Sequence, residues 1–506
     1  MKLHIDNQLI DLDCLRKISS ESVIISIDQS VKSKVELAFQ HIQASINKNE
    51  TVYGVNTGFG KLARIRIENE DLADLQRNLV CSHAVGVGDF LPEKIVKIIM
   101  ILKVVALSKG LSGVCNTVIE RLCDLINHRI FPCIPAKGSV GASGDLAPLA
   151  HLSQVLIGEG EASYKGEVIS AKEALQLCSL EPLKLGPKEG LALLNGTQVS
   201  TAIAISAYFE VENLFQAAIY AGALTVDAIK GSQKPFDSRI HKARGHHGQK
   251  VVAEKLKSLL KGSEIMTSHN NCDRVQDPYS IRCQPQVMGA CLDIMHHVSS
   301  VLVIEANAVT DNPLVFVDTE EIVSGGNFHA EPVAFASDHL ALAIAEIGSI
   351  AERRCALLID PQLSGLPAFL VKESGLNSGF MIPQVTAAAL VSENKTLAHP
   401  ASVDSIPTSA NQEDHVSMAT HAANRLLTMT QNLAYVIAIE YLSAAQGIEF
   451  HQPLNTSKQL LETMLNIRTV SGSLINDRSL ASDIKSLSEL IISGEFCPQE
   501  FEIFSK

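Results

Sequence analysis

The hydrophobic and polar positions follow two different patterns along the chain. Near its start, the apolar runs 3–12 and 23–27 have the length and composition of short strands. Asp28 comes next and can cap a helix, because an apolar stripe follows it at helical spacing: Val31, Val35, Ala38, Phe39, Ile42 and Ile46. The pattern predicts a small mixed α/β region at the start of the chain.

Beyond about residue 90 the apolar positions recur almost entirely with helical spacing. The segments 197–229, 285–309 and 412–446 are long enough for extended helices, and the apolar positions from Leu340 to Ala351 mark another. Helices that are apolar on most faces must pack against other helices or other copies of the chain. We therefore expect a mainly α protein, with a mixed α/β N-terminal domain over residues 1–110 and a long-helix bundle over residues 111–506.

Composition narrows the class of protein. Of the 506 residues, 46% are hydrophobic and 19% are charged, which excludes wholesale disorder. The net charge of -13 argues against a partner that is a nucleic acid or an anionic membrane surface. The most apolar stretch, Ile95–Leu107, contains Lys97 and Lys103, so it is too short and too charged to span a bilayer.

Cysteine usage and the N-terminus point to the cytoplasm. The 11 cysteines form no CxxC pair, so the sequence predicts neither a disulfide framework nor a zinc ribbon. Residues 1–17 are acidic and lack the apolar run of a signal peptide. We expect a soluble protein in a reducing compartment.

Five short stretches rich in Gly, Asn, Ser and Pro separate the predicted helices. They are 53–60, 137–148, 271–285, 324–332 and 400–411. Loops of this composition normally lie on the surface and carry binding or catalytic residues. Each stretch here contains side chains suited to chemistry, so these loops are where a site is expected.

The stretch from Gly138 to Leu149 is the most informative of them. Its glycine spacing fits neither a phosphate-binding loop nor a nucleophile elbow. It can be a simple turn that caps a helix beginning near Asp145. It can also be reactive, because Gly144 lacks a Cβ and its nitrogen can approach the Ala142 carbonyl in a sharply bent backbone. Ring closure and loss of the Ser143 hydroxyl as water would leave an exocyclic methylidene.

With these residues in view, the chain resembles the aromatic amino acid ammonia-lyases that use a 4-methylidene-imidazol-5-one (MIO) group, and most closely their histidine-specific members. The resemblance covers nearly the whole chain. Seven motifs carry it in the family order: Tyr53-Gly-Val-Asn-Thr-Gly-Phe-Gly60, Ser82-His83-Ala84, Gly141-Ala-Ser-Gly-Asp-Leu-Ala-Pro148, Asn195-Gly196-Thr197, Gln276-Asp-Pro-Tyr279-Ser-Ile-Arg282, Gly325-Gly-Asn-Phe328-His329 and Asn411-Gln-Glu413-Asp-His415. One motif can arise by chance, but seven in order are a strong signal.

The resemblance implies a self-formed cofactor and a set of site residues. MIO would form autocatalytically from Ala142, Ser143 and Gly144, so no pyridoxal phosphate is needed. The catalytic residues would be Tyr53 as the base, Ser143, Asn195, Tyr279 and Glu413. The substrate would be bound by His83, Gln276, Arg282, Phe328 and Glu413. The adjacent histidine pairs point about 100° apart on a helix, and no metal is expected.

Each of these side chains also has a plain structural interpretation. The Tyr53 ring can pack on a neighbour, Arg282 can form a surface salt bridge, and Phe328 can be core. Asn195 can cap the helix that follows it, and Glu413 can be a first-turn residue favoured by the helix dipole. Placement in Gly-rich polar loops favours the functional interpretation.

The resemblance also implies the reaction and the assembly. The expected activity is deamination of L-histidine to trans-urocanate and ammonia, the first step of histidine degradation. Relatives acting on phenylalanine or tyrosine carry Gln where Glu413 stands, so Glu413 favours histidine. The implied fold is a fumarase/aspartase-like helical bundle, in a homotetramer with shared active sites. The alternatives are a tyrosine or phenylalanine ammonia-lyase or 2,3-aminomutase, a non-catalytic scaffold, and a fumarase-like lyase without MIO.

Overall fold

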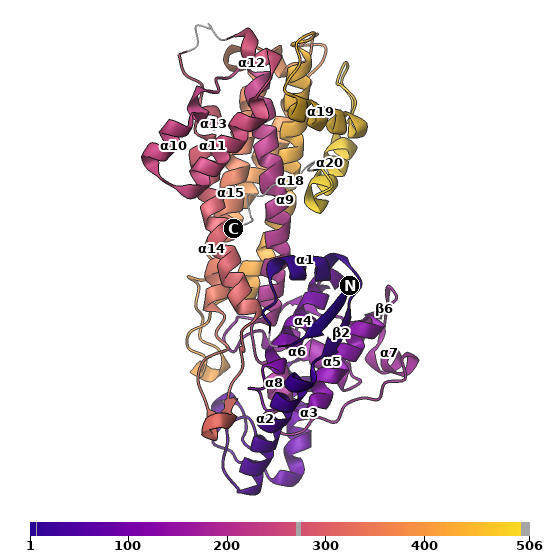
Figure 1. Ribbon diagram of the computed structural model, residues 1–506. Helices are drawn as coiled ribbons and strands as arrows, with labels where there is room; N and C mark the ends of the chain where they lie inside the picture. The colour runs from indigo at the N-terminus through magenta and orange to yellow at the C-terminus, as the bar shows by residue number, and fades with distance from the viewer. Residues whose placement is uncertain (7, 270–274, 497–506) are drawn as a thin grey trace. The chain divides into compact units, whose positions relative to one another are not determined.

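The computed structural model describes residues 1–6, 8–269 and 275–496, and helices dominate it (Figure 1). The helices are α1 (Leu12–Ser20), α2 (Gln29–Asn47), α3 (Leu72–His83), α4 (Glu93–Ser108), α5 (Asn116–His128), α6 (Leu146–Leu156), α7 (Ala171–Leu177), α8 (Glu189–Leu194), α9 (Gln198–Ala228), α10 (Ser238–Arg244), α11 (His247–Leu260), α12 (Glu264–Ser268), α13 (Tyr279–Arg282), α14 (Gln284–Ala306), α15 (Glu331–Ile359), α16 (Pro361–Ser364), α17 (Met381–Leu397), α18 (Ala419–Glu449), α19 (Lys458–Val470) and α20 (Ala481–Ser493). The prediction of a mainly α protein with long helices is confirmed.

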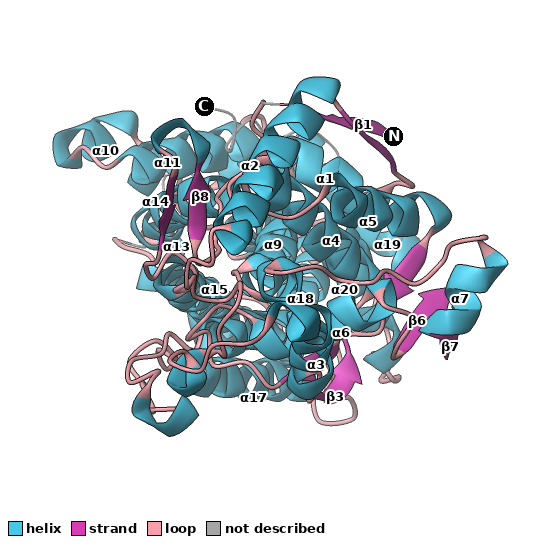
Figure 2. Ribbon diagram, turned by 90° about the horizontal axis from the view of Figure 1, so that it is seen from below, coloured by secondary structure: helices cyan, strands magenta, loops and turns pink. Residues whose placement is uncertain are grey.

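The strands are short and form small separate sheets (Figure 2). They are β1 (Lys2–Ile5), β2 (Ile24–Ile27), β3 (Val87–Phe90), β4 (Ile130–Pro132), β5 (Pro135–Lys137), β6 (Glu161–Tyr164), β7 (Glu167–Ser170), β8 (Leu314–Phe316) and β9 (Glu321–Val323). The first two pair in parallel, with Lys2 opposite Ile24. The antiparallel sheets are β3-β5, β4-β6-β7 and β8-β9.

The chain divides into two compact units. The first contains residues 1–206, 299–338 and 400–424, and the second contains residues 207–298, 339–399 and 425–506. All of the strands described above belong to the first unit. The boundary predicted between residues 110 and 111 lies inside the first unit. A separate N-terminal domain over residues 1–110 stays a prediction.

Three expected boundaries are corrected by local contacts. The predicted strand 3–12 ends at Ile5, because the side chain of Asp11 accepts a hydrogen bond from the Cys14 N–H and starts α1. The predicted loop 271–285 contains α13, and its residues 271–274 lie outside the described part. The helix expected from residue 412 begins only at Ala419, after a left-handed Met418 with φ 56°.

Two other expectations near the start hold. The second predicted strand is β2, and Asp28 caps α2 by accepting a hydrogen bond from the Ser30 N–H. The side chains of Val31, Val35, Ala38, Ile42 and Ile46 are buried along one side of α2, whereas Phe39 is only half-buried. The apolar stripe therefore identified the packed face of this helix.

An ion pair joins three long helices in the core of the second unit. The Arg354 guanidinium in α15 lies 2.5 Å from the Glu440 carboxylate in α18, and both side chains are fully buried. Thr225 in α9 donates a further hydrogen bond of 2.8 Å to Glu440. Removing one partner would leave an uncompensated buried charge, at a cost of about 3–5 kcal/mol.

Two helices, α14 and α15, are long and apolar enough to cross a membrane by length and composition alone. Core helices of soluble proteins pass the same test, and 72% of the apolar window of α15 is buried within the chain. Only 39% of the window of α14 is buried. This helix therefore leaves an apolar surface, of the kind that interfaces cover.

Candidate active site

A cleft of about 1100 Å³ opens in the first unit, and the polar loops of the sequence line it. Seven of the residues expected at the site line this cleft: Tyr53, His83, Ala142, Ser143, Asn195, Phe328 and Glu413. They come from six separate parts of the sequence. The fold of the first unit therefore brings together most of the residues that the motifs singled out.

The Gly-rich loop before α6 has a backbone that only glycine fits. Gly144 has φ +74°, and a Cβ there would lie 2.2 Å from the Gly196 carbonyl oxygen. Gly141 has φ +68°, and a Cβ there would lie 2.3 Å from the Ser417 Oγ. The loop is thus packed closely against the turn after α8 and against the segment before α18, and Ala142 and Ser143, between the two glycines, line the cleft.

Asp145 anchors this loop from its buried side. One carboxylate oxygen accepts hydrogen bonds from the backbone N–H and the hydroxyl of Ser200, at 2.7 and 2.9 Å. The other accepts from Thr420 at 2.6 Å. Burial raises the pKa of Asp145, and these hydrogen bonds oppose the shift. Asp145 stands at the N-cap position of α6, but its side chain makes no cap hydrogen bond to that helix.

Asn195 faces the reactive triplet from the opposite side. Its Nδ2 donates to the carbonyl oxygen of Ser143 at 3.4 Å, and its Oδ1 is buried without a hydrogen-bond partner among the described residues. Asn195 follows the last residue of α8, and α9 starts at Gln198. The interpretation of Asn195 as the cap of α9 is therefore wrong, and its side chain is free to act in the cleft.

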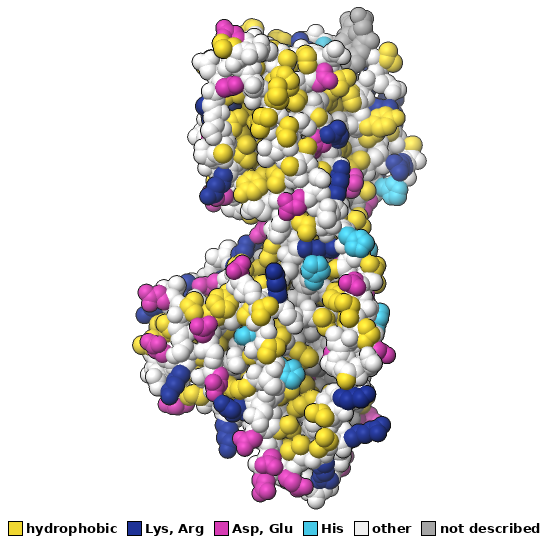
Figure 3. Space-filling view, turned by 180° about the vertical axis from the view of Figure 1, so that it is seen from behind, with side chains coloured by type: hydrophobic (Ala, Val, Ile, Leu, Met, Phe, Trp, Pro, Cys, Tyr) yellow, Lys and Arg dark blue, Asp and Glu magenta, His cyan; other side chains and the backbone are white. Residues whose placement is uncertain are grey.

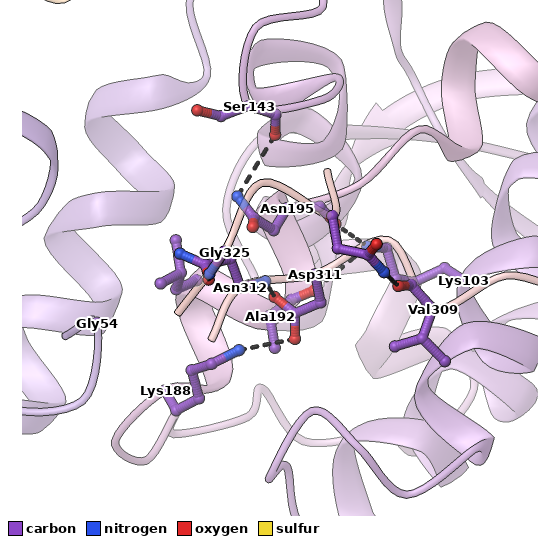
Figure 4. A network of polar contacts seen from close by, with 12 residues as sticks. Gly54, Lys103, Ser143, Lys188, Ala192, Asn195, Val309, Asp311, Asn312 and Gly325 are labelled. Carbon is purple, nitrogen blue, oxygen red and sulfur yellow. Dashed lines mark hydrogen bonds and ion pairs between the residues drawn. The ribbon is translucent and has the colours of Figure 1, made fainter. Parts of the chain in front are cut away.

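Lys103, which the sequence did not single out as a site residue, contacts the backbone of Asn195 (Figure 4). The Lys103 ammonium group lies in the buried helix α4 and donates to the backbone oxygens of Asn195 and Ala192, at 2.6 and 3.2 Å. Burial lowers the pKa of Lys103 to about 7. The signal available in the sequence was a single lysine within the otherwise apolar run 98–107.

The buried Lys103 predicts a pH dependence of stability. Its pKa is lower in the folded chain than the unfolded value of 10.5, so between about pH 7 and 10.5 the unfolded chain binds the extra proton. We expect the stability of the wild type, relative to Lys103→Met, to rise with pH in this window by on the order of 1 kcal/mol per pH unit. Melting temperatures measured from pH 7 to 10 test this. The exposed Lys250→Met is the control, and parallel profiles for wild type and Lys103→Met would contradict the assignment.

A buried ion pair lies next in sequence to Asn312, which lines the cleft. The Lys188 ammonium group lies 2.7 Å from the carboxylate of Asp311, and neither side chain is accessible beyond 5%. The next residue, Asn312, accepts a hydrogen bond from the Gly325 N–H at 2.7 Å (Figure 4). This contact ties the loop that carries Phe328 to the rest of the unit.

Glu413 is held by three hydroxyl groups. Its Oε1 accepts from Ser143 Oγ at 2.7 Å, and its Oε2 accepts from Thr408 and Ser409 at 2.8 and 2.9 Å. Because α18 begins at Ala419, the interpretation of Glu413 as a first-turn residue is wrong. The preceding Ser409, Ala410 and Asn411 all have positive φ, a strained backbone of the kind that functional sites concentrate.

His83 ends α3 and presents one ring nitrogen as an acceptor. Its Nδ1 lies 2.9 Å from the Leu79 carbonyl oxygen, which can only accept, so Nδ1 carries the proton. Nε2 then keeps its lone pair. Burial lowers the pKa of His83, an effect opposed by the Leu79 hydrogen bond and by the charge of Glu413. The neutral ring can therefore accept a hydrogen bond from a ligand N–H.

Tyr53 and Phe328 line the cleft from two glycine-rich loops. The Tyr53 hydroxyl accepts a hydrogen bond from the Gly60 N–H at 3.3 Å. Both rings are only half-buried, so neither is plain core.

Gln276, Tyr279 and Arg282 belong to the second unit, and none of them lines the cleft of the first. The Arg282 guanidinium stacks over the Tyr279 ring at 4.5 Å, and its Nε is buried without a partner among the described residues. Tyr279 is 70% exposed, and Gln276 is also exposed. No ion pair of Arg282 is present among the residues that the structure describes, and the surface salt bridge considered for it stays a hypothesis.

Comparisons with known proteins identify the family of the chain. The family model for aromatic amino acid lyases matches residues 10–469. The histidine ammonia-lyase of Vibrio vulnificus is 55% identical over 483 residues, which cover 95% of this chain and 94% of that protein. The crystal structure of histidine ammonia-lyase from Trypanosoma cruzi matches with a TM-score of 0.90 at 39% identity, covering 98% of this chain and 94% of that one.

A solved structure with another activity is equally similar in fold. Tyrosine aminomutase from Streptomyces globisporus matches with a TM-score of 0.93 at 33% identity, over 98% of both chains. The shared fold therefore does not distinguish these substrates, and the choice depends on the residues of the cleft. Both the family model and the relatives nevertheless cover nearly the whole sequence, and the chain belongs to the aromatic amino acid lyase family.

Proposed function

We propose that this enzyme removes ammonia from L-histidine to give trans-urocanate, the first step of histidine degradation. The observation that carries the proposal is the contact of 2.7 Å between the Glu413 carboxylate and the Ser143 hydroxyl. A carboxylate at this position can pair with an imidazole N–H or with imidazolium. The same carboxylate beside a phenyl ring would be desolvated without a partner.

The electrophile is MIO, formed from Ala142, Ser143 and Gly144. The Gly144 nitrogen attacks the Ala142 carbonyl carbon and one water leaves, and the Ser143 side chain then loses its hydroxyl and the α-proton as a second water. The residues present fit this group, because the loop accepts only glycine at position 144 and Asn195 donates to the oxygen that becomes the ring carbonyl. Once formed, the methylidene is an electrophile that makes the substrate amine a better leaving group.

The chain supplies the proton transfer and the orientation of the substrate. Tyr53 acts as the base that removes the β-proton, and its hydroxyl oxygen is oriented by the hydrogen bond from the Gly60 N–H. Asn195 stabilises negative charge that develops on the Ser143 carbonyl oxygen. His83 accepts a hydrogen bond from the imidazole, Glu413 binds the other side of the ring, and Phe328 excludes water from the cleft.

Arg282, Tyr279 and Gln276 complete the site from another copy of the chain, in a cytoplasmic homotetramer with shared active sites. The guanidinium of Arg282 would bind the substrate carboxylate in a bidentate manner, and Tyr279 and Gln276 would orient the amine. Two observations support this assembly. None of the three lines the cleft of its own first unit, and the apolar surface of α14 needs a cover. Hydrophobic groups on the surface are visible in yellow in Figure 3.

Product analysis tests the substrate. The purified enzyme is incubated with L-histidine, L-tyrosine or L-phenylalanine, and urocanate, coumarate, cinnamate and the corresponding β-amino acids are measured. We expect kcat/KM for histidine to exceed that for the other two by at least roughly 100-fold, because the polar groups of the cleft are left unpaired by a hydrocarbon ring. A preference for tyrosine or phenylalanine, or a β-amino acid as the main product, would contradict the proposal.

A further inference from the structure

Two histidines and a glutamate meet at the edge of the cleft, outside the groups assigned above. They are His329, Glu331 and His415, and their ligand atoms all lie within 4.8 Å of one another. The Glu331 Oε2 lies 3.9 Å from Nδ1 of His329 and 3.9 Å from Nε2 of His415. The two imidazoles are nearly parallel, at 13°, with centroids 5.7 Å apart.

The glutamate Oε2 at the centre of this cluster is buried and has no hydrogen-bond partner within the described part of the chain. A buried carboxylate oxygen without a partner is unfavourable, because it has lost its hydration and gained no hydrogen bond in return. The two rings are close to it but are not within hydrogen-bonding distance. A cation placed between the three groups would satisfy this oxygen.

The protonation of His329 also suits a ligand. Its Nε2 lies 3.2 Å from the backbone oxygen of His415, which can only accept, so Nε2 carries the proton. The lone pair is then on Nδ1, the atom nearer Glu331. Metal-bound histidines commonly donate their other ring N–H to a backbone carbonyl in this way.

We propose that His329, Glu331 and His415 form a binding site for one divalent transition-metal ion, with Zn²⁺ as the best match. Two imidazole nitrogens and one carboxylate oxygen are a recurrent zinc ligand set, with bonds of about 2.0–2.2 Å. The ligand atoms are slightly too far apart for these bonds, and a closure of a few tenths of an ångström would form them. Hard cations such as Mg²⁺ prefer oxygen ligands and fit the set poorly.

The ion would link two loops that carry residues of the cleft. His329 follows Phe328, and His415 lies two residues after Glu413, while Glu331 is the first residue of α15. Both histidines line the cleft itself. Binding would fix the Phe328 loop to the Glu413 loop, and positions left open on the ion would face the substrate.

Equilibrium dialysis of the metal-free protein against Zn²⁺, followed by elemental analysis, tests the site. We expect the wild type to bind one ion per chain with micromolar or tighter affinity, and Zn²⁺ to raise its melting temperature. Glu331→Gln and His415→Gln should each weaken binding by at least about 100-fold, since even outer-shell changes cost 10–100-fold. Circular dichroism of each variant checks that it is folded.

Two controls separate this site from other sources of metal binding. His297→Gln is the control for the loss of a histidine. The His297 ring also lies near another imidazole, that of His339, with centroids 5.8 Å apart, but it is outside the His329–Glu331–His415 cluster. This variant should bind Zn²⁺ as the wild type does. Co²⁺ loading should give a visible spectrum without the charge-transfer band of thiolate ligands. Absence of stoichiometric binding by the wild type, unchanged affinity in Glu331→Gln and His415→Gln, or a thiolate band would overturn the proposal.

Discussion

Ser143→Ala is expected to abolish turnover of histidine while the chain still folds. Without the hydroxyl group, the second water cannot leave and no methylidene forms. The β-proton and the amine must then be removed without an electrophile, so we expect kcat to fall by at least roughly a thousandfold, or about 4 kcal/mol of transition-state stabilisation. The hydroxyl group, which contacts Glu413 before the ring forms, is absent from the mature wild type as well, so its removal should have little effect on stability.

Intact mass gives a measurement that does not depend on activity. The mass of the wild type should be lower than that of its translated sequence by two water molecules. The mass of Ser143→Ala should be lower by at most one, because its side chain has no hydroxyl group to lose. Ser153→Ala is a matched control, because Ser153 is a buried serine in α6 whose hydroxyl donates to the Leu149 carbonyl within its own helix. It should keep both the activity and the mass loss. An active wild type with an unmodified mass would remove the basis of the mechanism.

The loops of the site were predictable because their chemistry is local. Glycines at positions 141 and 144 and the polar residues around them indicated a special backbone, and the structure has φ near +70° at both. The long helices were predictable for a similar reason, since their apolar periodicity continues over many turns.

Features that depend on tertiary contacts were not predictable. A helical pattern continued back to residue 412, but the hydrogen bonds of Glu413 to Thr408 and Ser409 keep this segment out of α18. Lys103 looked like a charge that interrupts an apolar helix, because its partners are carbonyl oxygens about 90 residues later. The cluster of His329, Glu331 and His415 joins two loops, so no single spacing in the sequence indicates it.

Glu413→Gln is expected to lower kcat/KM for histidine by roughly 100-fold, because a charge-assisted hydrogen bond contributes about 1.5–3 kcal/mol. The amide has nearly the same shape, and its oxygen can still accept from Thr408 and Ser409, so the loop should keep its conformation. The change therefore removes the charge and leaves the geometry. Activity on phenylalanine or tyrosine, measured as cinnamate or coumarate, should rise relative to histidine, since an uncharged amide is cheaper to desolvate beside a hydrocarbon ring.

Asp414→Asn separates the specific role of Glu413 from the general effect of negative charge in the cleft. Asp414 is the next residue, lines the same cleft and is exposed, and its substitution removes the same unit of charge. If the field of the cleft alone selects histidine, both variants lose activity to a similar extent. If the carboxylate acts by direct contact with the imidazole, only Glu413→Gln does so, because exposed charges are screened by water and salt. Unchanged histidine kinetics in Glu413→Gln would show that other groups, such as His83, determine the substrate.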